Sequence, residues 1–134
     1  MRFVLDASVA VAAQRPNDPH HQAARARIVR FLTGEDTALV PSLFVVEVSG
    51  ALARLGFERA KIVRIVDALT AYPHQVVTVG PRSARAARAI AIQAKLRGPD
   101  ALYVWLARRS GAALCTIDPE MAARGAAFCE ISAP

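Results

Sequence analysis

The sequence predicts an α/β fold in which a parallel sheet is covered by helices on both faces. Short apolar segments, suited to strands, alternate along the chain with longer amphipathic segments, suited to helices. The strand-like segments are apolar almost throughout, as expected for strands that are buried on both faces. The chain has 134 residues, 54% of them hydrophobic, which is enough for one core. We therefore expect a single domain over residues 1–134.

The first half of the chain is expected to begin with a buried strand and to end with two consecutive helices. Asp18-Pro19 is typical of a helix start, Gly34 of a helix end and Ser42 of an N-cap. Gly56-Phe57 separates two amphipathic segments and so predicts a tight link between antiparallel helices. The pattern places strands at 2–5 and 38–40, and helices at 9–14, 20–32, 42–55 and 58–71.

The second half continues the alternation and supplies three more strands. Pro81 and Asp118-Pro119 are typical of helix starts, and Gly111 of a helix end. Strands are expected at 75–79, 112–117 and 126–131, and helices at 81–96, at 99–109 and directly after Asp118. Cys115 and Cys129 both fall in strand-like segments, where we expect small buried free thiols rather than a disulfide.

The charge of the chain favours a polyanionic partner. Seventeen Lys and Arg against eleven Asp and Glu give a net charge of +6, and the sequence pI is about 10.3. Arg82, Arg85 and Arg88 lie at helical spacing and form either a solvated helix face or a ridge that contacts phosphates. No apolar run approaches the length of a membrane span and no secretory signal is recognisable, so we expect a cytoplasmic protein.

Three acidic residues stand at the ends of expected elements. Asp6 follows the first strand, Asp118 follows the fourth, and Asp100 lies in the first turn of a helix. Each of them alone could cap that helix or interact with its dipole, a contribution of about 1 kcal/mol. They therefore indicate a functional site only when they are considered together.

Glu47 lacks a comparable structural explanation. It lies inside the helix expected at 42–55, beside Leu43 and Phe44, on an apolar face where an ionised carboxylate needs a partner. An ion pair with a buried arginine is one alternative to a functional role. Gly50 costs that helix about 1 kcal/mol relative to Ala, which suggests close approach of another backbone segment beside Glu47.

Together the four carboxylates point to one edge of the sheet. In an open parallel sheet, sites form beyond the carboxyl ends of the strands, and the helices that follow the strands begin at that same edge. Clustered carboxylates repel one another unless a cation lies among them. Oxygen ligands without His or Cys select Mg²⁺ or Mn²⁺, and such ions support phosphoryl transfer to an activated water.

Four short segments carry a resemblance to PIN-domain ribonucleases. They are Val4-Leu5-Asp6-Ala7-Ser8, Val45-Val46-Glu47-Val48, Asp100-Ala101-Leu102-Tyr103 and Thr116-Ile117-Asp118. Their order and the size of the chain are similar to those of VapC-type toxins of toxin–antitoxin pairs. The resemblance covers nearly the whole chain. It implies a three-layer α/β/α sandwich with strand order 3-2-1-4-5, endonucleolytic cleavage of RNA dependent on Mg²⁺ or Mn²⁺, a homodimer, and inhibition by a cognate antitoxin protein.

The resemblance also assigns roles to the carboxylates. Asp6, Glu47 and Asp100 match the main metal-binding residues of the family, and Asp118 matches a fourth, more variable one that can act through water. All four are therefore candidates for both metal binding and catalysis. Gly98-Pro99 departs from the family pattern, because it makes the segment before Asp100 stiffer than a polar segment would be. This stiffness could alter the direction of the Asp100 side chain.

Three further residues are candidates for supporting roles. Ser8 matches the small hydroxyl that hydrogen-bonds within the site of the family. Thr116 is either a second supporting hydroxyl or an ordinary strand residue. Glu120 is either an auxiliary acid or a residue suited to the first turn of a helix.

Two other functions remain as alternatives. A haloacid-dehalogenase-type phosphatase also places an Asp after its first strand, but it needs a second Asp where this chain has Ser8. A non-catalytic or degenerate PIN-like module would bind nucleic acid without cutting it. Separately, the helical hairpin at 42–71 carries Phe44, Phe57 and Ile65, which indicate either a dimer or antitoxin groove or ordinary core packing.

Overall fold

A five-stranded parallel sheet forms the centre of the computed structural model, which describes residues 1–134. Its strands lie in the order β3-β2-β1-β4-β5, and all four pairings are parallel. The expected strand order 3-2-1-4-5 is thereby confirmed, and β1 lies at the centre between β2 and β4. The strands are β1 (Arg2–Leu5), β2 (Thr37–Pro41), β3 (Gln75–Val77), β4 (Ala113–Cys115) and β5 (Ile131–Ser132).

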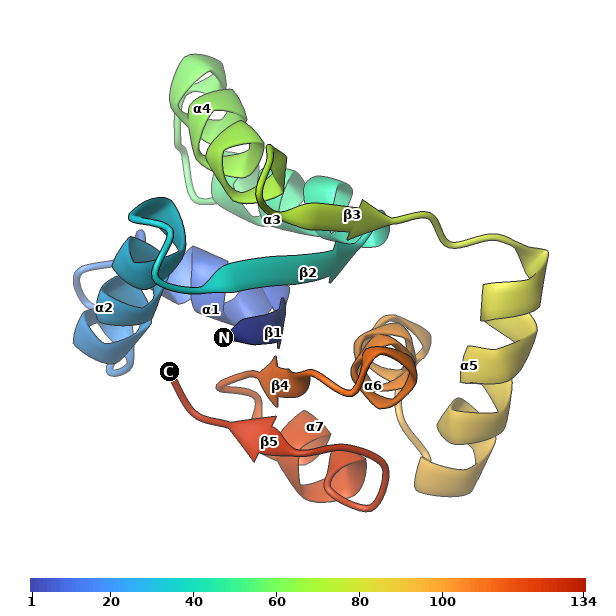
Figure 1. Ribbon diagram of the computed structural model, residues 1–134. Coiled ribbons are helices and arrows are strands. Elements are labelled where there is room, and N and C mark those ends of the chain that lie inside the picture. Colours follow the sequence, from blue (N-terminus) through green and yellow to red (C-terminus); the bar gives the residue numbers. More distant parts are fainter.

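Helices cover both faces of this sheet, as the expected α/β/α layering requires (Figure 1). One layer contains α1 (Ala7–Ala12), α2 (His21–Leu32), α3 (Leu43–Arg54) and α4 (Arg59–Thr70). On the other face α6 (Gly98–Ser110) packs against β1, β2 and β4, and α7 (Pro119–Gly125) packs against α6. The remaining helix, α5 (Pro81–Ala94), packs mainly on α6, and Figure 1 shows it standing outside that helix.

Residues of the central strands are buried on both faces, which explains why these segments are apolar almost throughout. Val4, Leu5, Val40 and Leu114 have no exposed surface. They belong to one cluster of 34 buried apolar residues that extends into α1, α3 and α6. This core fixes where β1 and β4 end, and therefore where Asp6 and the residues after β4 lie.

Two of the expected helix caps are absent. The Ser42 side chain does not cap α3; its hydroxyl accepts a hydrogen bond from the amide of Val79 (3.2 Å) and so holds the segment after β3. Asp18 accepts from the amide of His20 (2.8 Å), closing a turn before α2 begins at His21. Both side chains satisfy backbone amides of loops rather than of the helices.

The expectation of a strand over 126–131 is wrong for most of that segment. The amides of Phe128 and Cys129 both donate to the carbonyl of Gly125, at 2.8 and 3.2 Å, so the chain turns after α7 and only then enters β5. Cys129 is therefore half-buried in a turn, whereas Cys115 is buried in β4 as expected. Both thiols are free, and burial raises the pKa of each to about 11.

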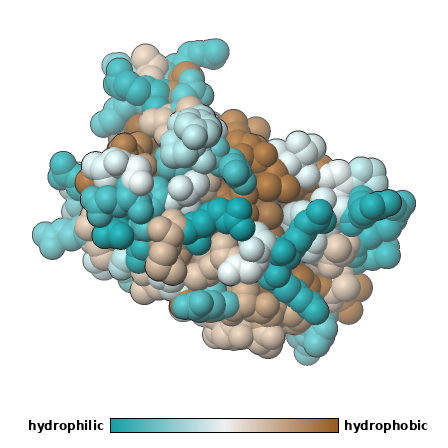
Figure 2. All heavy atoms as spheres, in the orientation of Figure 1, coloured by the Kyte–Doolittle hydropathy of each residue, from teal (hydrophilic) through white to brown (hydrophobic).

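The helical hairpin formed by α3 and α4 contributes its largest side chains to the chain's own core. Phe44 has no exposed surface, and Phe57 and Ile65 pack against the core with part of their surface. Core packing therefore accounts for Phe44 and for part of the surface of Phe57 and Ile65, and a dimer or antitoxin groove on this hairpin stays a prediction. Figure 2 shows hydrophilic side chains over the projecting α4 and α5 regions, with apolar atoms gathered on the face between them. None of the helices combines the length and the apolar character needed to cross a membrane.

Candidate active site

Asp6 lies at the centre of the carboxyl edge of the sheet, where β1 ends and α1 begins. Its amide donates to the carbonyl of Cys115 (3.0 Å) and extends the pairing of β1 with β4. Although Asp6 holds the N-cap position of α1, its side chain does not cap that helix. Its Oδ2 accepts instead from the hydroxyls of Ser8 and Thr116, the latter at 2.7 Å. The capping alternative therefore does not account for this carboxylate.

The environment of Asp6 disfavours its charge. Burial raises its pKa and the negative charge of Asp100 raises it further, while the hydrogen bonds from Ser8 and Thr116 oppose the increase. Thr116 is itself buried and accepts from the amide of Asp118 (3.0 Å). Ser8 and Thr116 thus both support the position of Asp6.

Glu47 projects from α3 and meets α6 beyond the end of the sheet. The hydroxyl of Tyr103 donates to its Oε1 at 2.8 Å, and no arginine pairs with it. Burial raises the pKa of Glu47, the Tyr103 hydrogen bond opposes the increase, and the charges of Asp6 and Asp100 add to it. The polar partner of Glu47 on its apolar helix face is therefore the hydroxyl of the buried Tyr103. The alternative of an ion pair with a buried arginine is wrong.

Asp100 lies in the first turn of α6 and is buried, with Gly98-Pro99 forming the start of the helix. Its Oδ2 accepts from Nε of Arg97 (3.2 Å). Burial raises the pKa of Asp100, and the positive charge of Arg97 opposes that change. Gly98 and Pro99 form the first turn of α6 itself, and Asp100 lies near enough to Asp6 for its charge to raise the pKa of Asp6.

Asp118 combines a capping role with contact to the site. Its Oδ1 accepts from the amides of Glu120 (2.9 Å) and Met121 (3.0 Å), so the capping explanation applies to this residue. Its Oδ2 lies 3.6 Å from a terminal nitrogen of Arg97. Glu120 is exposed and pairs with Arg124 (3.3 Å), which places it on the outer side of α7.

The four carboxylates share one region, but in this arrangement each is turned toward a partner of its own. No three carboxylate, imidazole or thiolate side chains are close enough together to hold an ion among them. One oxygen each of Asp6, Glu47 and Asp100 accepts no hydrogen bond from the protein. The donor set, oxygen only and crowded with like charge, has the chemistry of a site for a hard divalent cation.

Two residues at the site were not identified by the sequence reasoning. Tyr103 lies three residues after Asp100 on α6, and Arg97 lies three residues before it. Side chains three apart on a helix are neighbours, so this spacing could have indicated both. Tyr103 also ends one of the four segments that carry the family resemblance, where it had no role assigned.

The close approach expected at Gly50 is absent. A Cβ atom built on Gly50 would meet no atom of the protein within 4 Å. Gly50 instead lines an open groove of about 540 Å³ between α1 and α3, together with Ser8 and Glu47.

Comparisons with known proteins agree with this geometry. The profile of the PIN domain family matches residues 3–126. Ribonuclease VapC31 of Mycobacterium tuberculosis is 33% identical over 133 residues, covering 90% of this chain and 91% of the relative. Ribonuclease VapC25 of the same species is 28% identical over 129 residues, with the same coverage. The crystal structure of Mycobacterium tuberculosis VapC20, a sarcin–ricin loop cleaving toxin, superposes with a TM-score of 0.75 at 19% identity over 98% of both chains, which is a likeness of fold.

Proposed function

Because the chain belongs to the PIN-domain family, and within it to the VapC-type ribonucleases, we propose that it is the toxin of a toxin–antitoxin pair. In this proposal it is an endoribonuclease that hydrolyses phosphodiester bonds of RNA with the help of Mg²⁺ or Mn²⁺. A cognate antitoxin, a homodimeric state and a cytoplasmic location are parts of the same proposal. The basic character of the chain, with a net charge of +6, supports an RNA substrate.

One observation supports the proposal above all others. Asp6, Glu47 and Asp100 come from three different elements and lie close together: the charge of Asp100 raises the pKa of Asp6, and the charges of Asp6 and Asp100 raise that of Glu47. Such repulsion is costly in a protein that has no cation to place there, and it is useful in one that does. A structural role alone does not explain why three half-buried or buried carboxylates meet at this edge.

In this proposal some residues of the site bind the metal ion and others hold those ligands in position. Asp6, Glu47 and Asp100 would hold the ion after their side chains turn from their present partners toward it, with Asp118 assisting directly or through water. Ser8 and Thr116 fix the carboxylate of Asp6, because both donate to the same oxygen. Tyr103 fixes Glu47 in the same way. When bound, the ion would supply a more acidic water and would neutralise charge that develops on the phosphate.

Replacing Asp6 by Asn tests the proposal. Asn retains an acceptor for the hydroxyls of Ser8 and Thr116 and removes a charge that burial already disfavours, so we expect the fold to survive. RNA cleavage by the purified variant should fall below detection, and its unfolding temperature should no longer rise when Mg²⁺ or Mn²⁺ is added. Full metal-dependent cleavage by an Asp6→Asn preparation free of contaminating ribonuclease would contradict the proposal.

A titration of the unaltered chain separates this proposal from a degenerate PIN-like module. An intact site should raise the unfolding temperature progressively with Mn²⁺ concentration, since an ion that binds only the folded state stabilises it. A degenerate module would bind RNA without such stabilisation and without cutting. The presence of all four carboxylates at one edge favours the intact site.

A further inference from the structure

The groove between α1 and α3 runs directly from the candidate active site. Ser8 and Glu47 line one part of it, and Arg15 and Arg54 line other parts. Glu47 and Arg54 are seven residues apart on α3, which corresponds to about 10 Å along the helix axis. The groove therefore connects Glu47 at the candidate active site with two arginines farther along.

The apolar wall of the groove is left open by the chain's own packing. Val46 and Gly50 lie one turn apart on the same side of α3, and Val46 is 69% exposed. A Cβ atom at Gly50 would meet nothing within 4 Å beyond the backbone of its own helix, so no contact with another segment requires a glycine there. A glycine in mid-helix weakens the helix. Its presence at position 50 is explained if a larger side chain would fill the groove and block a ligand.

Four charged side chains line the groove, Glu47 and Asp18 with the arginines Arg15 and Arg54, and the two arginines are the groups that can bind phosphate. Arg54 lies in the last turn of α3, is exposed and makes no ion pair. Arg15 is half-buried and only loosely paired, its guanidinium lying 3.9 Å from Asp18. A planar guanidinium binds phosphate through parallel hydrogen bonds, and a shallow apolar wall can take the face of a base or a ribose.

We propose that this groove binds the single-stranded RNA segment next to the scissile phosphate. Arg54, with Arg15, would bind a neighbouring phosphate, and the wall at Val46 and Gly50 would contact the nucleoside between that phosphate and Glu47. This inference rests on the proposed ribonuclease function and adds which side of the site carries the substrate. Unpaired nucleotides can be splayed out of a single strand and laid against such a wall.

Filling the groove at Gly50 tests the apolar part. Gly50→Leu should fold with an unfolding temperature at or above that of the unaltered chain, because the added side chain enters open space and removes a helix-weakening residue. Gly50→Ala is the matched control, since it removes the same glycine but adds little bulk. In steady-state cleavage, Gly50→Leu should raise KM about 10-fold with kcat little changed, as expected when uniform substrate binding is lost. Gly50→Ala should leave both values unchanged.

Neutralising Arg54 tests the phosphate contact. Binding of a short fluorescein-labelled single-stranded RNA of randomised sequence would be followed by anisotropy in EDTA, which keeps the RNA intact. Arg54→Gln should weaken binding and reduce the slope of log K against log salt by about 0.7, the value for one lost contact with a single strand. Arg109→Gln is the matched control: the same charge is lost at the far end of α6, away from Asp100.

The outcomes separate this inference from the function on which it rests. If the unaltered chain binds and cleaves RNA but Gly50→Leu and Arg54→Gln do so equally well, the groove assignment is wrong and the function stands. The assignment is also wrong if Arg109→Gln loses as much affinity as Arg54→Gln, or if Gly50→Leu loses only the association with a co-expressed antitoxin. If the unaltered chain neither binds nor cleaves RNA, the proposed function fails and the groove assignment fails with it.

Discussion

The hydroxyl of Thr116 donates to Oδ2 of Asp6 across 2.7 Å and accepts from the amide of Asp118 at 3.0 Å. One buried side chain thereby connects the end of β1 with the segment that follows β4. Because neighbouring parallel strands end at the same edge, a residue just beyond β4 can reach a carboxylate just beyond β1. The position of Asp6 thus depends on sheet register as well as on its own backbone.

Replacing Thr116 by Val should therefore damage the site and the fold together. The methyl group keeps the volume but removes one hydrogen bond to Asp6 and leaves the Asp118 amide without its acceptor. We expect a loss of about 1–3 kcal/mol in the free energy of unfolding, measured by denaturant titration. Mn²⁺ affinity, measured from the metal-induced rise in unfolding temperature, should fall about 10- to 100-fold, as for other residues that orient a metal ligand.

Thr116→Ser is the control for this prediction, because Ser retains the hydroxyl and loses only a methyl group. Its Mn²⁺ affinity should stay close to that of the unaltered chain. If Val and Ser lower the affinity equally, the effect comes from packing in the strand, and the hydroxyl has no specific role.

Arg97 should compete with a bound cation. Its guanidinium lies 3.2 Å from Asp100 and 3.6 Å from Asp118, so a positive charge already stands beside two of the proposed ligands. Arg97→Gln removes that charge, and we expect Mn²⁺ to bind on the order of 10-fold more tightly at low salt. The measurement is a calorimetric titration of the metal in the absence of RNA.

Arg109→Gln provides the matched control for Arg97, since it changes the net charge equally at the far end of α6. It should leave Mn²⁺ affinity unchanged. Weaker metal binding in Arg97→Gln would contradict competition and would mean instead that Arg97 holds Asp100 and Asp118 in the orientation that the ion needs.

The fold was predictable because its determinants are local and repeated. The same α/β architecture follows from the apolar runs, from the residues that start and end helices, and from the position of Asp6 directly after a buried strand. The strand at 126–131 was mispredicted because apolar residues also occur in a partly exposed turn, and only the hydrogen bonds to Gly125 distinguish the two. The strand order came from the family resemblance and not from the periodicity.

The site was predictable in its carboxylates but not in their partners. Glu47 was recognisable because a charge on an apolar helix face needs compensation, yet the sequence could not say that Tyr103 supplies it. That contact joins residues 56 positions apart and depends on how α3 and α6 approach beyond the sheet. Gly50 was recognisable as unusual, but whether it faced protein or solvent depended on packing that a sequence pattern does not contain.

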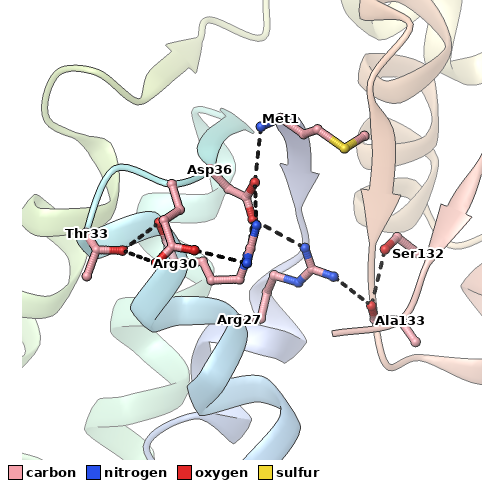
Figure 3. A network of polar contacts seen from close by, with 8 residues as sticks. Met1, Arg27, Arg30, Thr33, Asp36, Ser132 and Ala133 are labelled. Atoms are coloured by element: carbon pink, nitrogen blue, oxygen red, sulfur yellow. Dashed lines mark hydrogen bonds and ion pairs between the residues drawn. The ribbon is translucent and has the colours of Figure 1, made fainter.

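Asp36 should stabilise the fold without affecting the chemistry. It is 2% exposed and lies before β2, at the edge of the sheet opposite to Asp6. Its carboxylate accepts from Nε of Arg30 (2.6 Å) and from the amino group of Met1 (3.1 Å), and Arg27 lies 3.5 Å away (Figure 3). Asp36→Asn should lower the free energy of unfolding by about 1–3 kcal/mol, because charge-assisted hydrogen bonds are lost.

The readout for Asp36→Asn is denaturant unfolding paired with RNA cleavage well below the unfolding temperature. The cleavage rate should match that of the unaltered chain. A large drop in cleavage by a folded variant would show that the two edges of the sheet are coupled.

His74 should make the free energy of unfolding depend on pH near its ordinary pKa of 6.5. Its Nδ1 accepts from the amide of Ala38 (3.0 Å), and burial lowers its pKa below 6.5 against the opposing effect of a hydrogen bond to the Phe31 backbone. The unfolded chain therefore binds more protons than the folded chain between the lowered pKa and 6.5. The free energy of unfolding should decrease as the pH falls through about 6.5, and level off below the pKa of folded His74.

His74→Asn isolates this contribution, because its Oδ1 can still accept from Ala38 but does not titrate. Denaturant unfolding at pH values from about 7.5 to 5 should show a steeper loss of stability in the unaltered chain than in the variant. The carboxylates whose pKa is raised, Asp6, Glu47 and Asp100, act in the opposite direction at the acid end, but they are common to both chains and cancel in the difference. Parallel stability curves would mean that folding leaves the pKa of His74 unchanged, and the prediction would be wrong.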